Sequence, residues 1–184
     1  MNASEFFQIS ADFELRSKPD WLDAYRTKYD LPYDYHMTFK VTTHCRSEDL
    51  DKMKAELAEM AENQKPITVV FDELFIAPTS KGWCIMVKAQ DSPELRGLQK
   101  EISDKFAQYG AIINSEREDY EKNFKPHITI ARRLTDEQLE QAKSELKPDL
   151  ACDTVIQNLV LTTVPEDKFE EWSKAENRIF YKLK

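Results

Sequence analysis

The sequence lacks several features that would place it outside the cytoplasm. Its three cysteines, Cys45, Cys84 and Cys152, are odd in number and widely spaced, which favours reduced and mostly buried thiols over a disulfide framework. No apolar run reaches the length needed to span a membrane, and the first residues carry no basic region typical of a signal peptide. We therefore expect a soluble cytoplasmic protein, with one domain over residues 1–184.

The sequence also lacks an excess of positive charge. Its formal net charge is −8, so it does not have the broad basic surface with which proteins hold long polynucleotides. A small or single-stranded nucleotide needs only local positive charge, and Lys40, Lys125, Arg132 and Arg133 could supply it. Acidic runs such as residues 116–119 are interpreted as a solvated face or a loop.

Histidine is equally scarce, and two of the three histidines occur in the same local pattern. The strings YHMTF (35–39) and PHITI (126–130) each place a threonine two residues after a histidine, inside an apolar run that favours a β-strand. On a strand, residues two apart leave the same face, so each string predicts a paired His/Thr. The two histidines are 127 − 36 = 91 residues apart. His44 has no such threonine and is predicted to be structural or solvated.

Two converging His/Thr pairs would equip a phosphodiesterase that needs no metal. One of His36 and His127 would accept a proton while the other donates one. Thr38 and Thr129 would donate hydrogen bonds to phosphoryl oxygens. The sequence predicts these four residues as catalytic and predicts no cofactor.

The order of predicted elements repeats along the chain. Each half reads as strand, helix, HxT strand, helix, strand, strand, which predicts an α+β fold of two lobes related by a pseudo-twofold axis, with helices outside and a cleft between them. The predicted strands are 6–13, 35–43, 67–77, 83–88, a strand carrying His127 near 126–133, 153–164 and 178–183, and the predicted helices are 19–29, one capped by Ser47, one capped by Ser92 and ending at Gly110, and one opened by a capping box at Thr135.

The two strings resemble the paired HxT signatures of the 2H phosphoesterase superfamily, which includes the 2′-5′ RNA ligase-like cyclic phosphodiesterases. The stretch from Phe124 to Arg132, FKPHITIAR, is the more specific match. The resemblance implies a bilobal fold and a hydrolase acting on a nucleotide phosphodiester, such as a 2′,3′-cyclic phosphate or a 2′-5′ linkage. It also implies that one histidine acts as base and the other as acid.

Five further residues are candidates for binding the substrate. Arg132 completes the second motif, although strict alternation would send it to the face opposite His127, whereas Arg133 is in register with the motif. Lys40 would share the face of His36. Tyr35 and Trp83 could stack on a base, with core packing as the alternative.

Other functions stay open at this point. The chain could degrade cyclic nucleotide or oligonucleotide signals, or could keep the fold and bind nucleotides without turnover. A zinc site built from His36, His44, Cys45 and His127 is a third possibility, but the spacing of these residues does not support it. We expect a monomer with no metal and no membrane partner.

Overall fold

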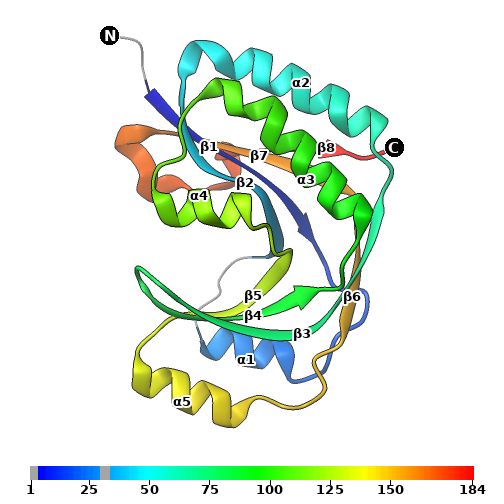
Figure 1. The fold of residues 1–184 in the computed structure, drawn as a ribbon, viewed down its shortest axis with the longest axis vertical. Coiled ribbons are helices and arrows are strands. Elements are labelled where there is room, and N and C mark those ends of the chain that lie inside the picture. The colour runs from blue at the N-terminus through cyan, green and yellow to red at the C-terminus, as the bar shows by residue number, and fades with distance from the viewer. Residues whose placement is uncertain (1–3, 30–33) are drawn as a thin grey trace.

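The chain folds into two lobes, each built on a four-stranded antiparallel sheet, which lie one above the other in Figure 1. The computed structural model describes residues 4–29 and 34–184. Sheet A has the order β2-β1-β7-β8 and sheet B the order β5-β4-β3-β6, so each HxT strand forms an edge. Sheet A contains β1 (Ser4–Phe13), β2 (Tyr35–Arg46), β7 (Asn158–Pro165) and β8 (Arg178–Lys182), and sheet B contains β3 (Ile67–Thr79), β4 (Gly82–Ala89), β5 (His127–Leu134) and β6 (Cys152–Ile156).

The helices cover the outer faces of the sheets and connect the two lobes. α2 (Leu50–Asn63) packs on β7 and β8 of sheet A, and α5 (Asp136–Glu145) packs on β4 and β5 of sheet B. α1 (Leu22–Lys28) follows a strand of sheet A but packs on β5 of sheet B, whereas α3 (Pro93–Phe106) follows a strand of sheet B but packs on β2 of sheet A. This exchange holds the lobes together through a shared apolar core.

Sequence patterns located several elements closely. Ser92 accepts a hydrogen bond from the backbone N–H of Leu95, with Pro93 in the first turn, and Thr135 and Gln138 form the predicted capping box. Ser47 instead opens a short 3-10 helix, and α2 begins after Asp49 without a side-chain cap. The two-lobed α+β architecture is confirmed.

Two expectations about the chain's course are wrong. The predicted strand 153–164 is two strands, β6 in sheet B and β7 in sheet A, separated at Gln157. The lobes are therefore not the two halves of the chain, because β3 and β6 join the His127 sheet and β7 and β8 join the His36 sheet. Residues 115–122 form helix α4, and its acidic run fits the solvated face that the sequence allowed there as well as a loop.

The pseudo-twofold relation extends to irregularities of the strands. Each HxT strand carries two β-bulges against its neighbour: Phe7, Ile9 and Ser10 pair with Thr43, Lys40 and Thr38, and Trp83, Ile85 and Met86 pair with Leu134, Ala131 and Thr129. Corresponding residues of β2 and β5 differ by the spacing of the histidines, since 129 − 38 = 91 and 134 − 43 = 91. An extra residue turns all later side chains of a strand to the other face. The bulges therefore decide which side chains beyond the motifs reach the space between the sheets.

All three cysteines are free thiols, and Cys45 and Cys152 are buried as expected. None of the helices in the described part of the chain is long and apolar enough to cross a membrane.

Candidate active site

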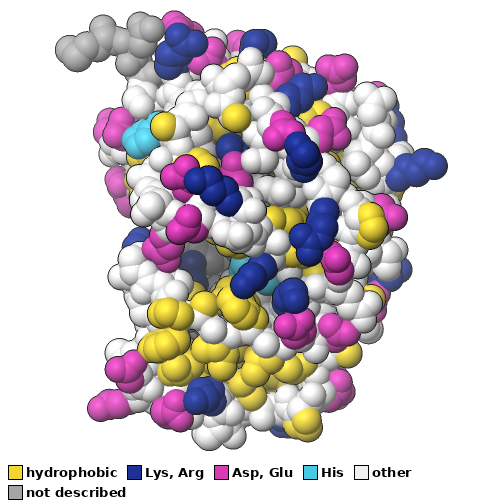
Figure 2. All heavy atoms as spheres, viewed as in Figure 1, with side chains coloured by type: hydrophobic (Ala, Val, Ile, Leu, Met, Phe, Trp, Pro, Cys, Tyr) yellow, Lys and Arg dark blue, Asp and Glu magenta, His cyan; other side chains and the backbone are white. Residues whose placement is uncertain are grey.

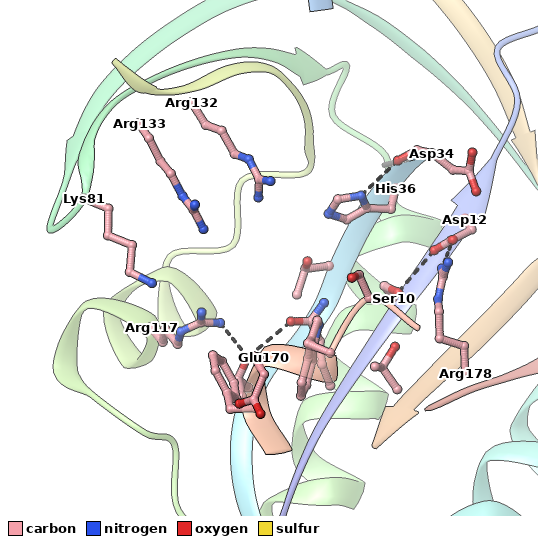
Figure 3. Close-up of a pocket in the computed structure, with 17 residues that line it drawn as sticks. Ser10, Asp12, Asp34, His36, Lys81, Arg117, Arg132, Arg133, Glu170 and Arg178 are labelled. Atoms are coloured by element: carbon pink, nitrogen blue, oxygen red, sulfur yellow. Dashed lines mark hydrogen bonds and ion pairs between the residues drawn. The ribbon is translucent and has the colours of Figure 1, made fainter. Parts of the chain in front are cut away.

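A cleft of about 500 Å³ opens between the lobes beside the first HxT motif (Figure 3). In the space-filling view, histidine is visible in a hollow among lysine and arginine side chains (Figure 2). The lining is mostly polar and comes from both sheets, α4 and the segment before β8: Gln8, Ser10, Asp12, Asp34, His36, Thr38, Thr42, Lys81, Arg117, Arg132, Arg133, Thr162, Phe169, Glu170, Trp172, Ser173 and Arg178. His127 and Thr129 lie on β5, the strand that also presents two of these arginines.

The backbone fixes both histidines in the same way. The Nδ1–H of His36 donates to the carbonyl oxygen of Asp34 at 3.2 Å, and the Nδ1–H of His127 donates to that of Lys125 at 2.8 Å. In both cases the acceptor is the residue two positions earlier. With Nδ1 protonated, the neutral ring has its lone pair on Nε2, and Nε2 is then the atom that can take up or release a proton.

Burial and nearby charges lower the pKa of both imidazoles. Burial lowers the pKa of His36, and the charges of Arg26 and Arg132 lower it further, while the carbonyl of Asp34 opposes the shift. Burial likewise lowers the pKa of His127, and the charge of His36 adds to the decrease. β2 and β5 are in direct contact and the charge of His36 acts on His127, so the two histidines lie near one another. His36 and Thr38 line the cleft, whereas His127 and Thr129 are not among its lining residues.

Tyr120 on α4 joins the two motifs and was not predicted. Its hydroxyl donates to the carbonyl oxygen of Thr38 at 3.3 Å, and its ring meets the imidazole of His127 edge-on, with centroids 5.6 Å apart. Burial raises the pKa of the Tyr120 phenol, which therefore stays protonated as a donor. A sequence signal that could have indicated α4 is Asn114, whose side chain caps the helix by accepting from the N–H of Arg117.

The bulges bring Arg132 and Arg133 to the cleft together. Strict alternation would have placed them on opposite faces, but both stand opposite the single residue Cys84 of β4, since Trp83 pairs with Leu134 and Ile85 with Ala131. Arg133 has a φ of 57°, in the left-handed region that side chains other than glycine seldom adopt. Both arginines line the cleft, and their contact with substrate stays a prediction.

The same kind of bulge removes Lys40 from the site, and this corrects its predicted role. The extra residue Phe39 turns Lys40 to the core face of β2, where it is 2% exposed and forms a 2.5 Å ion pair with Glu121 of α4. Glu121 also accepts from the N–H of Val41 at 3.3 Å, a backbone group at the bulge. Lys40 anchors α4 and does not reach the cleft.

Neither predicted stacking aromatic lies in the cleft. Tyr35 is buried, bonds to Asp23 at 2.9 Å and lies under the guanidinium of Arg26, 3.6 Å from its ring centroid. Trp83 packs against the core and donates its indole N–H to Asp136 at 2.7 Å. Both fit the core-packing alternative, although Tyr35 also lines a second cavity that shares Asp12 and Asp34 with the cleft, and stacking of either ring on a base stays a prediction.

Two other aromatic residues and one ion pair line the cleft instead. Phe169 and Trp172, whose rings are 5.6 Å apart, line the cleft from the segment between β7 and β8. Asp12 stands opposite His36 in the β1–β2 register and forms an ion pair with Arg178. These residues lie far from the motifs in sequence, and no local pattern could have assigned them to the site.

The zinc set considered from the sequence does not assemble. His44 is eight residues from His36 on the extended β2 strand, which corresponds to roughly 26 Å at the usual rise of a strand. His44 packs against Phe6, with ring centroids 4.4 Å apart, and Cys45 is buried in the core. Across residues 4–29 and 34–184, no three His, Cys, Asp or Glu side chains gather where they could hold a metal ion.

Two HxT strands on the facing edges of pseudo-symmetric sheets define a protein of the two-histidine (2H) phosphoesterase class. Comparison with known proteins agrees with this class, because a family model described as the 2′-5′ RNA ligase superfamily matches residues 19–167. The chain therefore belongs to the 2′-5′ RNA ligase superfamily.

Individual relatives are distant. A candidate phosphoesterase of Bacillus licheniformis is 24% identical over 139 residues, covering 73% of this chain and 76% of that protein. E. coli LigT, solved with 3′-AMP, has a TM-score of 0.54 at 17% identity and covers 100% of this chain and 97% of its own. Usb1 of Kluyveromyces marxianus has a TM-score of 0.56 at 10% identity, covering 97% and 98%. The structural likenesses establish a shared fold.

Proposed function

We propose that this protein is a metal-independent phosphodiesterase that cleaves a small or single-stranded nucleotide phosphodiester, namely a 2′,3′-cyclic phosphate or a 2′-5′ linkage. The observation that carries the proposal is the matched anchoring of His36 and His127 by backbone carbonyls, which leaves Nε2 of each ring for proton transfer. The binding of 3′-AMP by E. coli LigT supports a nucleotide substrate. A single bilobal domain, acting as a cytoplasmic monomer without a cofactor, completes the proposal.

The chemistry requires one neutral and one protonated histidine. In hydrolysis of a cyclic phosphate, Nε2 of the neutral ring takes a proton from water as the new P–O bond forms. Nε2 of the charged ring gives a proton to the ribose oxygen as its bond to phosphorus breaks. The lowered pKa values of His36 and His127 favour the neutral base, and the bound phosphate stabilises the charged acid.

The threonines and one arginine would stabilise the transition state. Thr38 and Thr129 lie two residues beyond the histidines, before the first bulge, so strand alternation keeps each hydroxyl on the face of its histidine. Each hydroxyl can donate to a non-bridging oxygen as charge builds on it. Arg132, whose charge already acts on His36, is placed to neutralise the same phosphoryl group.

Turnover of nucleoside 2′,3′-cyclic phosphates, 2′-5′ oligoadenylate and cyclic dinucleotides, each measured with and without EDTA, tests the proposal. We expect hydrolysis of one of the first two substrates at a rate that EDTA does not change. His36→Ala and His127→Ala should each lose on the order of 10² to 10⁴ in kcat, the usual value of a positioned acid or base. The double variant should lose much less than the product of the two, because both groups act in one step.

Three results would contradict it. Near-normal activity in either single variant would remove that histidine from the mechanism. Chelation that abolishes activity, with recovery on adding a divalent ion, would indicate a metal-bound hydroxide. Tight nucleotide binding with no turnover of any substrate would identify a binding protein.

A further inference from the structure

A group of cations lines one part of the cleft. We call Lys81, Arg117 and Arg133 the cationic rim; all three point into the same cavity as Arg132 (Figure 3). Lys81 lies in the β3–β4 hairpin turn, Arg133 at the end of β5, and Arg117 on α4. Three elements that are remote in sequence therefore converge on one region, in a chain whose formal net charge is −8.

The fold holds two residues of the cationic rim, Arg133 and Arg117, in place. Arg133 reaches the cleft because a bulge holds it at a φ of 57°, a conformation that costs energy for an arginine. Arg117 is half-buried and donates to Thr42 Oγ1 at 2.7 Å, and burial lowers the pKa of its guanidinium. Thr42 is the bulge residue of β2 that corresponds to Arg133 of β5, since 133 − 42 = 91.

The charge in the cleft exceeds what one phosphodiester requires. The reacting group carries one negative charge, and the two histidines, the two threonines and Arg132 can attend to it. Among the described residues, three carboxylates line the cleft: Asp12 is paired with Arg178, Asp34 lies beside His36, and Glu170 is exposed. The charge of Glu116, an exposed residue of α4, also acts on Arg117. In this part of the chain the three rim cations thus face two solvated acids, and the surplus of positive charge favours a second anion.

We infer that the cationic rim is a second phosphate subsite, and that the substrate carries a phosphate besides the one that is cleaved. This inference rests on the proposed function, since it assigns the reacting phosphate to the histidines and Arg132. The substrate class is then a nucleotide with at least two phosphate groups, either a 5′-phosphorylated nucleotide or an oligonucleotide. A nucleoside cyclic phosphate with a single phosphate lacks the group that the rim binds.

Binding and turnover are measured separately. Calorimetry compares adenosine 3′-monophosphate with adenosine 3′,5′-bisphosphate and with the dinucleotide ApAp, which carry the second phosphate in two different places. Turnover compares adenosine 2′,3′-cyclic phosphate with its 5′-phosphorylated form and with ApA ending in a 2′,3′-cyclic phosphate. One of the two longer probes should bind roughly tenfold or more tightly than the monophosphate, the size of a charge-assisted hydrogen bond, and with a steeper dependence on salt.

Substitutions in the cationic rim test which residues bind the second phosphate. Arg117→Gln, Arg133→Gln and Lys81→Gln should remove most of this advantage, measured as KM and Kd for the probes with two phosphates. Arg96→Gln and Lys65→Gln are matched controls, because both side chains are exposed and neither lines the cleft. The controls should keep the full preference.

The outcomes separate the two proposals. If the protein hydrolyses all three cyclic phosphates with equal KM and the three binding probes bind equally, the second subsite is refuted while the phosphodiesterase stands. If no substrate is turned over but the rim variants abolish a preference for the bisphosphate or ApAp, the proposed function fails and the subsite stands. A preference that survives in all three rim variants would also refute the assignment.

Discussion

The buried ion pair between Lys40 and Glu121 offers the sharpest test of how α4 is held at the site. Their side chains are 3% and 8% exposed, and Nζ and Oε1 are 2.5 Å apart. Glu121→Gln keeps the shape of the side chain but leaves the Lys40 ammonium buried without its counter-charge. Breaking a buried pair in this way costs about 3 to 5 kcal/mol. For a chain of this length, each kcal/mol lowers Tm by about 2 to 4 °C, so we expect a decrease of roughly 6 to 20 °C.

Urea and thermal denaturation measure this loss, and two further variants control it. Glu118→Gln on the same helix breaks an ion pair with Lys122 whose side chains are 51% and 65% exposed, and it should cost less than about 1 kcal/mol. The double variant Lys40→Met with Glu121→Gln removes both charges and should recover most of the stability. If Glu121→Gln costs no more than Glu118→Gln, or if the double variant is as unstable as the single one, the pair is not the anchor that we describe.

Three further predictions concern the chemistry. Thr38→Val and Thr129→Val should each lower kcat by about 10- to 10³-fold, up to the cost of one oxyanion donor, while His44→Ala stays within a few-fold; a large loss at His44 alone would refute the assignment. Tyr120→Phe removes the hydrogen bond to the carbonyl of Thr38 and should lower kcat modestly. Tyr120→Leu also removes the ring beside His127, so water should reach the imidazole and raise the pKa of His127. The second effect would be seen as a shift of one limb of the pH profile to higher pH. The pH profile of kcat/KM should be a bell centred below about pH 6.5, because burial lowers both histidine pKa values in the free enzyme. The pH profile of kcat should be a bell at higher pH, because the bound phosphate stabilises the imidazolium. A rate that rises steadily to about pH 9 would contradict both expectations.

Local patterns in the sequence were sufficient for the two motif strands and for the helix starts at Ser92 and Thr135. Alternation and capping act over a few residues, so they can be read without knowing the fold. The break at Gln157 could not be read in this way, because β6 and β7 are both apolar strands and only their pairing partners assign them to different sheets. α4 was missed for a related reason: none of its apolar side chains is fully buried, so it has no apolar stripe, and Glu121 holds it through the buried pair with Lys40.

The bulges mark the limit of sequence reasoning within the site itself. Side chains alternate regularly between the two faces of each motif strand up to Thr38 and Thr129. Beyond these residues one extra residue moves each later side chain to the opposite face. Strict alternation therefore places Lys40 on the cleft face and Arg132 on the opposite face, and the structure reverses both. A bulge depends on how a strand pairs with its neighbour, and nothing in the composition of YHMTFK or PHITIAR indicates it.

Symmetry and its absence have different roles in this cleft. The pseudo-twofold axis supplies two imidazoles anchored through Nδ1 in the same way, so neither is intrinsically the acid or the base. The surroundings are not symmetric: the charge of Arg132 acts on His36, whereas the ring of Tyr120 covers His127. The cationic rim and the Phe169–Trp172 pair also differ in chemistry, the first suited to phosphate and the second to a base. In the mechanism that we propose, we expect a nucleotide held between them to lie in one direction, and that direction would decide which histidine meets the leaving oxygen. The assignment of acid and base would then be a property of these asymmetric residues rather than of the HxT motifs.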